Sequence, residues 1–155
     1  MSRPTNTQFA LAVHVLTMLA ALPRELRNSE EMAGSAGSNP VHIRRVLGRL
    51  RAAGLVTSRS GPHGGWRLLR SPDQTTLADV WRAMNGDDQV LGLHEASPDC
   101  VVGQRIQRSL EAIDRRTLAA IEAELRTTTL ADLAAASSVT TSESVAARGP
   151  RERVA

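Results

Sequence analysis

The sequence of 155 residues predicts a mainly α-helical fold that includes one small β-hairpin and one long helix near the C-terminus. Apolar residues recur at helical spacing over the first fifty positions, and a glycine-rich turn between two strand-like runs follows them. A longer helical pattern comes after that turn. Aromatic residues make up only 2% of the chain, so Leu, Val, Ile and Ala must build the core. The length fits one globular domain with an appended element.

The first predicted helix covers Gln8 to Leu22 and is apolar almost all round, so we expect it to be buried. Pro23 ends it. The apolar stretch within it has the length of a signal peptide, but His14 and Thr17 interrupt it and no clear cleavage site follows. It is also too short to span a bilayer. We therefore expect a cytoplasmic protein, in which His14 is a hydrogen-bonded core residue rather than a metal ligand.

Two further helices are predicted from their caps. Asn28 caps a short helix over Glu30 to Ala36, and Gly37-Ser38-Asn39 makes a turn. A third helix begins at Pro40 behind the cap residue Asn39 and runs to about Ala53, where Gly54 provides a left-handed end. This order of elements, in which a short helix and a tight turn follow the first helix and precede another helix, is that of a helix-turn-helix unit.

The third helix has two chemically different faces. Four apolar residues share its inner face: Ile43, Val46, Leu47 and Leu50. His42, Arg45 and Arg49 share the opposite face at spacings of three and four. A polar face with Arg and His donors behind a capped N-terminus is what a recognition helix needs to reach base edges and phosphates in the major groove.

A β-hairpin is predicted directly after this helix. Leu55 to Arg59 and Trp66 to Arg70 are the two strands, and Gly64-Gly65 supplies the positive φ angles of the reversal. A hairpin tipped with Arg59 and His63 after a helix-turn-helix is a wing, which can follow the DNA backbone or enter the minor groove. The glycines could instead form only a turn. A phosphate loop for nucleotides would need them to lead into a helix, and they lead into a strand.

Charge is distributed unevenly along the chain. Every one of the 19 basic residues is Arg, and the segment from Pro40 to Pro72 holds seven Arg and no Asp or Glu. The balance is +6 over residues 1–82 and −3 over residues 83–155. Such a basic segment binds a polyanion by releasing its counterions, although a solvated basic face would have the same composition.

Thr76 caps a predicted fourth helix from Leu77 to Met84, and a polar connection leads from it to a long helix over Val101 to Arg126. The long helix has no evident partner in its own chain, so we expect its copy in a second subunit to cover the apolar stripe. The candidate dimerisation residues are Ile106, Leu110, Ile113, Ile121 and Leu125. The predicted organisation is a DNA-binding domain (1–84), a linker or sensor loop (85–100), dimerisation helices (101–136) and a disordered tail (137–155).

Several stretches resemble the Rrf-two family of bacterial winged helix-turn-helix transcriptional regulators over about residues 5–135. They are Phe9–Val13, Asn39–Leu47, Leu50–Ser58 continued by Gly61–Leu68, Thr76–Trp81 and Thr129–Leu133. The resemblance implies a homodimer that binds a palindromic operator and is held together by the long helix. Members that sense through a [2Fe–2S] cluster have three cysteines between the fourth helix and the long one.

This chain has a single cysteine, Cys100, which excludes an intrachain disulfide and a Cys-rich zinc module. One thiolate cannot hold a cluster that needs four ligands, even with His94 nearby, so we expect no cofactor. The four histidines have no metal-ligand spacing: His14, His42, His63 and His94. The sequence therefore looks closer to the cluster-free branch of the family, whose members respond to redox signals or to partner proteins.

Cys100 has two readings. Asp99 is the expected cap of the long helix, which places Cys100 in its first turn, where the helix dipole stabilises a reactive thiolate. Cys100 would then be an oxidant or electrophile sensor. It could equally be a small apolar residue packed at the dimer contact. The sequence leaves both open.

These observations predict a sequence-specific DNA-binding regulator, expected to be a homodimeric repressor. The assigned DNA-binding residues are Ser38, Asn39, His42, Arg44, Arg45, Arg49, Arg59, Ser60, His63 and Arg67. Asn39, His42 and Arg45 would lie nearest the bases, whereas the other arginines would serve phosphates and the wing. The alternative is a winged-helix module that docks a metabolic enzyme, which the acid-free Arg segment argues against. No residue pattern supports an enzyme.

Overall fold

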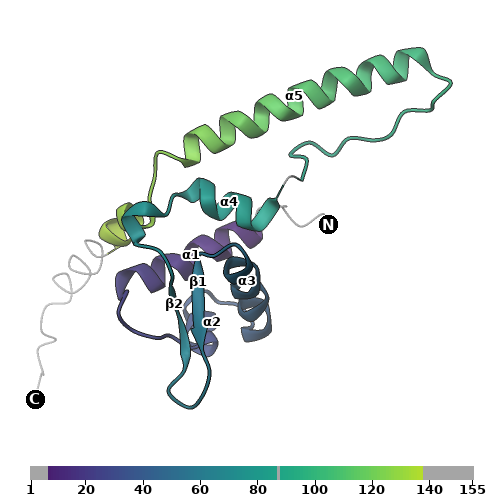
Figure 1. The fold of residues 1–155 in the computed structure, drawn as a ribbon. Coiled ribbons are helices and arrows are strands. Elements are labelled where there is room, and N and C mark those ends of the chain that lie inside the picture. The colour runs from purple at the N-terminus through teal and green to yellow at the C-terminus, as the bar shows by residue number, and fades with distance from the viewer. Residues whose placement is uncertain (1–6, 87, 138–155) are drawn as a thin grey trace, which may run out of the picture.

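The computed structural model describes residues 7–86 and 88–137, and it confirms a mainly helical fold with one antiparallel hairpin (Figure 1). The elements are α1 (Thr7–Ala21), α2 (Ser29–Ser35), α3 (Pro40–Ala52), β1 (Val56–Arg59), β2 (Gly65–Leu68), a 3-10 turn (Pro72–Gln74), α4 (Leu77–Asn85) and α5 (Val101–Leu125). Residues 130–137 are also helical. In the described residues, no helix combines the length and the apolarity needed to cross a membrane.

The helix caps follow the local sequence. The side-chain oxygens of Asn28 and Asn39 accept hydrogen bonds at 2.8 Å from the backbone amides of Glu31 and Val41. Each of these bonds satisfies an amide that has no partner inside its own helix. Behind α3, Gly54 has a φ of +71°, which reverses the chain into β1. The helix-turn-helix unit is therefore set by its cap residues.

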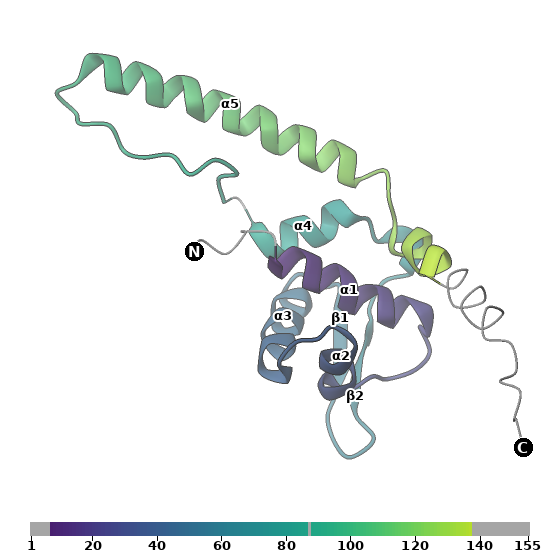
Figure 2. The same cartoon turned by 180° about the vertical axis from the view of Figure 1, so that it is seen from behind.

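The core lies between α1, α3, α4 and the helical residues 130–137 (Figure 2). The largest fully buried apolar side chains come from these segments and from α2 and β1: Val15, Leu16, Leu19, Met32, Ile43, Val46, Leu47, Leu50, Val56, Val80 and Leu130. The expectation that the first helix is buried all round is wrong, because only one side of α1 faces this core. His14 is exposed and lies 3.1 Å from the hydroxyl of Ser35, so it is not a core histidine.

The hairpin is joined by a third piece of extended backbone that the sequence did not predict. The strands β1 and β2 pair from Val56 opposite Leu68 to Arg59 opposite Gly65. Arg27, in the segment before α2, pairs with Trp66 through two backbone hydrogen bonds of 2.9 and 3.0 Å. The start of β2, next to the hairpin turn, is thereby fixed to the segment that leads into α2.

The turn of the hairpin depends on glycine for two reasons. Gly61 and Gly65 have φ values of +107° and +155°, so the expectation of positive φ is met at Gly65 and not at Gly64. At Gly64 the constraint is space, because a Cβ would lie 2.1 Å from the carbonyl oxygen of Arg59. A side chain at this position would force the turn open.

Helix α5 extends away from the body of the domain, and the connection from α4 runs beside it (Figures 1 and 2). Two side chains of α5 hold that connection. The carboxylate of Asp114, which is buried, accepts a hydrogen bond of 2.7 Å from the amide of Leu91, and Gln107 accepts one of 3.0 Å from the amide of Ala96. The predicted linker is thus an ordered strap along α5.

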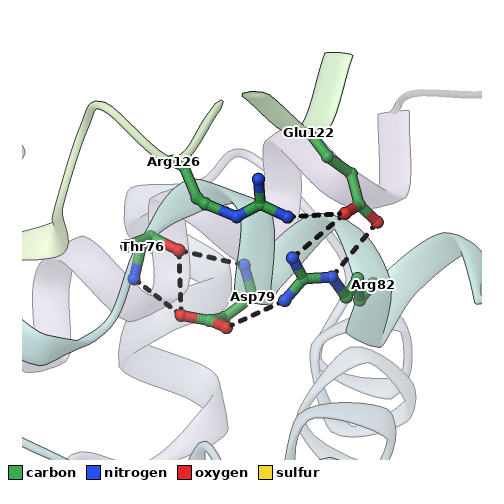
Figure 3. A network of polar contacts seen from close by, with 5 residues as sticks. All are labelled: Thr76, Asp79, Arg82, Glu122 and Arg126. Carbon is green, nitrogen blue, oxygen red and sulfur yellow. Dashed lines mark hydrogen bonds and ion pairs between the residues drawn. The ribbon is translucent and has the colours of Figure 1, made fainter. Parts of the chain in front are cut away.

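The C-terminal end of α5 is tied to α4 by an ion-pair network (Figure 3). Both Arg82 and Arg126 donate hydrogen bonds to Glu122, at 3.0–3.2 Å. Asp79 contacts Arg82 and also closes a capping box with Thr76 at the start of α4. Hydrogen bonding to Arg82 lowers the pKa of Glu122 below its ordinary value. The ion pairs of this carboxylate link the C-terminal end of α5 to α4.

Packing contacts cross the predicted boundary between a DNA-binding domain (1–84) and dimerisation helices (101–136). Leu130 is fully buried in the same core as α1, α3 and α4. Backbone hydrogen bonds from Leu77 to Thr128 and from Leu130 to Thr75 fix the returning chain. Leu130 therefore contributes to the core formed by the first 84 residues. The predicted tail lies outside the described residues, except for Ser137, which is helical.

Candidate nucleic-acid interface

The outer face of α3 has a small group of exposed side chains at its N-terminal end. Asn39, Val41, His42 and Arg45 line a shallow hollow of about 200 Å³. Arg45 is exposed and His42 is half-buried. Ser38 is half-buried in the preceding turn, where its amide bonds to the carbonyl of Ala33 at 3.0 Å. The structure therefore groups the three residues that we assigned to base contacts.

Arg44 lies beside this group and has partners within the chain. Its guanidinium forms an ion pair with Glu30 and donates a hydrogen bond of 3.1 Å to the hydroxyl of Ser29. The pKa of Glu30 is lowered by hydrogen bonding to a backbone amide and then by Arg44. Glu30 therefore offsets part of the positive charge that we assigned to phosphate binding.

The position of Arg49 differs from our expectation of a free phosphate donor. Its guanidinium donates to the side chain of Gln8 at 2.8 Å and to the backbone carbonyl of Met84. These contacts join α3 to α1 and α4. The helical spacing correctly placed Arg49 on the polar side of α3, but it could not reveal that α4 ends within reach of this side chain.

The wing presents its predicted residues to solvent. Arg59, Ser60 and His63 are exposed in and beside the turn, and Arg67 is exposed on β2. The hairpin turn extends beyond the helices on the side of the domain opposite α5 (Figure 1). A hollow of about 310 Å³ separates the wing from the start of α2.

Sequence reasoning missed one residue that supports the wing. The Arg51 guanidinium carbon lies 5.8 Å from the centre of the Trp66 ring, and the side chain also donates a hydrogen bond of 3.4 Å to Ser58. Arg51 therefore links the end of α3 to both strands of the hairpin. Arg51 belongs to the acid-free Arg segment, but the composition of that segment does not distinguish this arginine from the other six.

Cys100 is the N-cap of α5, and the prediction that Asp99 has this role is wrong. The sulfur of Cys100 accepts a hydrogen bond of 3.3 Å from the amide of Gly103, and its side chain is exposed. Within the described residues, no group of three or more His, Cys, Asp and Glu side chains could hold a metal ion.

The apolar stripe of α5 is partly exposed in the single chain. Ile106 and Ile113 expose 50% and 40% of their surface, and Val101 and Val102 expose still more. The other three candidate dimerisation residues are half-buried: Leu110, Ile121 and Leu125. Exposed apolar side chains are therefore concentrated in the N-terminal half of this helix.

Residues 5–136 match the Rrf2 family, described as iron-dependent transcriptional regulators. YwnA of Bacillus subtilis (strain 168), whose name gives it as a candidate HTH-type transcriptional regulator, is 33% identical over 83% of this chain and 95% of its own. The HTH-type transcriptional regulator NsrR of the same organism is 30% identical over 69% of this chain and 82% of its own. The structure of the B. subtilis global cysteine regulator CymR superposes with a TM-score of 0.62 at 26% identity, covering 87% of this chain and 98% of that one.

The iron in the family description does not fit the donor set of this chain. The sequence has one cysteine, and the nearest histidine in the sequence, His94, precedes it by six residues on the exposed strap. One thiol per chain falls short of the ligands that a [2Fe–2S] cluster requires. The family match over most of the chain and the winged helix-turn-helix architecture lead to the same conclusion: the chain belongs to the Rrf2 family and is a DNA-binding transcriptional regulator, not an enzyme.

Proposed function

We propose that this regulator is a homodimer that represses transcription from a palindromic operator in the bacterial cytoplasm. The observation that carries the proposal is the acid-free segment from Pro40 to Pro72, whose arginines lie on α3 and the hairpin. A homodimer presents two copies of this surface related by a two-fold axis, and a palindromic operator has two half-sites related by the same symmetry. A dimer seated on a promoter excludes polymerase.

The exposed residues divide into two roles. Asn39, His42 and Arg45 lie at the end of α3 that enters the major groove, where they read base edges. Arg59, Ser60 and His63 bring the wing to the backbone or the minor groove, and Arg67 adds a phosphate contact. We assign Arg49 a smaller direct role, because its donors already have partners within the chain.

Fluorescence anisotropy with DNA from upstream of the gene, and with a scrambled duplex of the same composition, tests DNA recognition. We expect selective binding whose affinity falls steeply with salt, as phosphate neutralisation requires. Arg45→Ala should lose about 1–3 kcal/mol and relax the sequence preference, whereas Arg67→Ala should weaken all sequences alike. Equal losses on both DNAs for Arg45→Ala would disprove its base-reading role. Binding to an enzyme but to neither DNA would favour the interaction-module alternative.

The apolar face of α5 supports the dimer. Covering Ile106 and Ile113 with the same helix of a second copy would remove their exposed surface from water. Sedimentation equilibrium should give a dimer for the wild type and a monomer for Ile106→Glu. Ala119→Glu, at another exposed position of α5 outside the stripe, is the matched control. A dimer that persists in Ile106→Glu would place the interface elsewhere.

We propose that Cys100 makes DNA binding sensitive to oxidants. Its exposed sulfur can attack one oxygen of a peroxide, so that an S–O bond forms, the O–O bond breaks, and a sulfenic acid and water or an alcohol result. The altered sulfur would no longer accept from Gly103 in the same way, which would change the start of α5. We expect peroxide to reduce operator affinity of the wild type and to leave Cys100→Ser unaffected. Equal sensitivity of both proteins would support the packing role instead.

We also propose that the regulator works without an iron–sulfur cluster. The single cysteine of the sequence supports this. Protein purified without oxygen should contain less than one iron per chain, show no visible absorbance from sulfide-to-iron charge transfer, and still bind its operator. A cluster absorbance that disappears in Cys100→Ser would refute the proposal.

A further inference from the structure

One exposed side chain at the recognition surface is apolar. Val41 is 59% exposed, although it is a large hydrophobic residue at the second position of α3. A single apolar side chain on a protein surface needs no explanation by itself. Val41, however, lines the same hollow as Asn39, His42 and Arg45, which are the residues grouped at the base-reading end of the helix.

The backbone holds Val41 in this outward position. Its amide is fixed by the hydrogen bond of 2.8 Å to the Asn39 side chain, and the inner face of α3 is occupied by other buried residues, starting with Ile43. Val41 and Arg45 are four residues apart, so they share one face of the helix. A β-branched side chain also has few χ1 rotamers in a helix, so a contact made by Val41 loses little side-chain entropy.

The chemistry of the major groove identifies what this side chain meets. Base edges there present hydrogen-bond donors and acceptors, and the C5 methyl of thymine is the apolar group among them. We propose that Val41 determines specificity by packing against the C5 methyl of one thymine in each half-site, beside the base that Arg45 reads. This inference rests on the proposed docking of α3 in the major groove, and it adds a residue that the sequence analysis did not assign.

The test begins with DNA that the full-length chain itself selects from a random duplex library. Each thymine of the selected site is then replaced singly by deoxyuridine, which removes the C5 methyl and leaves every hydrogen-bonding group of the base in place. We expect one thymine in each half-site to lose about fourfold in affinity, the effect of withdrawing one buried methyl group. The remaining thymines should change affinity by less than twofold.

Variants connect that thymine to Val41. Val41→Ala should bind the thymine duplex several-fold more weakly and should show no further loss with deoxyuridine, because the methyl no longer has a partner. Leu22→Ala, at an exposed apolar position just after the end of α1, should retain the full thymine preference. Thermal unfolding midpoints of both variants should stay within a few degrees of the wild type, since neither side chain is buried.

Each outcome has one meaning. An unchanged deoxyuridine effect in Val41→Ala, or a selected site in which no thymine methyl matters, overturns the role of Val41 while leaving DNA recognition intact. A library that yields no preferred sequence overturns the proposed operator binding, and this inference with it. Loss of the deoxyuridine effect in Val41→Ala, but not in Leu22→Ala, establishes the contact.

Discussion

Replacing Leu130 by Ala tests whether the chain after α5 is part of the DNA-binding domain. Leu130 is completely buried in the core shared by α1, α3 and α4. The substitution removes three carbon atoms, worth roughly 2.4 kcal/mol in transfer free energy. The cavity that remains adds to this cost, and measured values for buried Leu→Ala changes run from about 2 to 5 kcal/mol. We expect a loss of about 3 kcal/mol.

Urea unfolding followed by tryptophan fluorescence measures this loss at a fixed protein concentration. Trp81 reports on the core, because it is buried and its ring packs edge-on against Phe9 at 5.4 Å. Leu130→Val removes a single carbon and should cost about 1 kcal/mol, so it stays measurable even where Leu130→Ala unfolds. Leu69→Ala, at a position 60% exposed, is the control and should change stability by less than about 0.5 kcal/mol. A loss below about 1 kcal/mol for Leu130→Ala would refute the shared core.

Three further predictions concern the strap, the ion-pair network and the wing. Asp114→Ala removes the acceptor of the Leu91 amide, so hydrogen exchange and proteolysis should increase in residues 88–100 and stay unchanged in α3. Hydrogen bonding to Arg82 lowers the pKa of Glu122 from 4.5, so the contribution of Glu122 to stability is complete above pH 4.5 and is lost as the pH falls through the lower pKa of the folded state. Glu122→Gln should therefore abolish this part of the acid dependence of stability. An identical pH profile of stability for both proteins would contradict the prediction. Gly64→Ala should weaken operator binding, because the added Cβ would meet the carbonyl of Arg59 and distort the wing. Gly48→Ala on α3 is the control: a Cβ there meets no other atom, so the hairpin should stay intact.

The sequence predicted what depends on neighbours in the chain. Asn28, Asn39 and Thr76 were assigned as caps because each capping bond spans only two or three residues, and the structure confirms all three. The hairpin was predicted for the same reason, since its strands are joined by a short turn. Local chemistry was therefore enough to assign the helix-turn-helix unit and its wing.

Two of the features that the sequence analysis missed are contacts between distant segments. Pairing of Arg27 with Trp66 joins residues that are 39 positions apart, and Arg49 meets Met84 across 35. Neither pair leaves a periodic signal in the sequence. The prediction for His14 failed because the apolar composition of a helix does not reveal which of its faces are packed against other elements. Asp99 was expected to cap α5 because aspartate is a preferred N-cap residue, but the helix begins one residue later and Cys100 is its N-cap.

The burial of Leu130 has a consequence for how this protein is made. During synthesis the N-terminal helices leave the ribosome first, yet their core lacks a residue that lies beyond the whole of α5. The α5 helix has therefore emerged before the winged domain is complete. Nascent chains cut short before residue 130 should stay protease-sensitive in their DNA-binding half. If the proposed dimer forms through α5, then every chain whose winged domain is complete has already synthesised the helix that it needs for dimerisation.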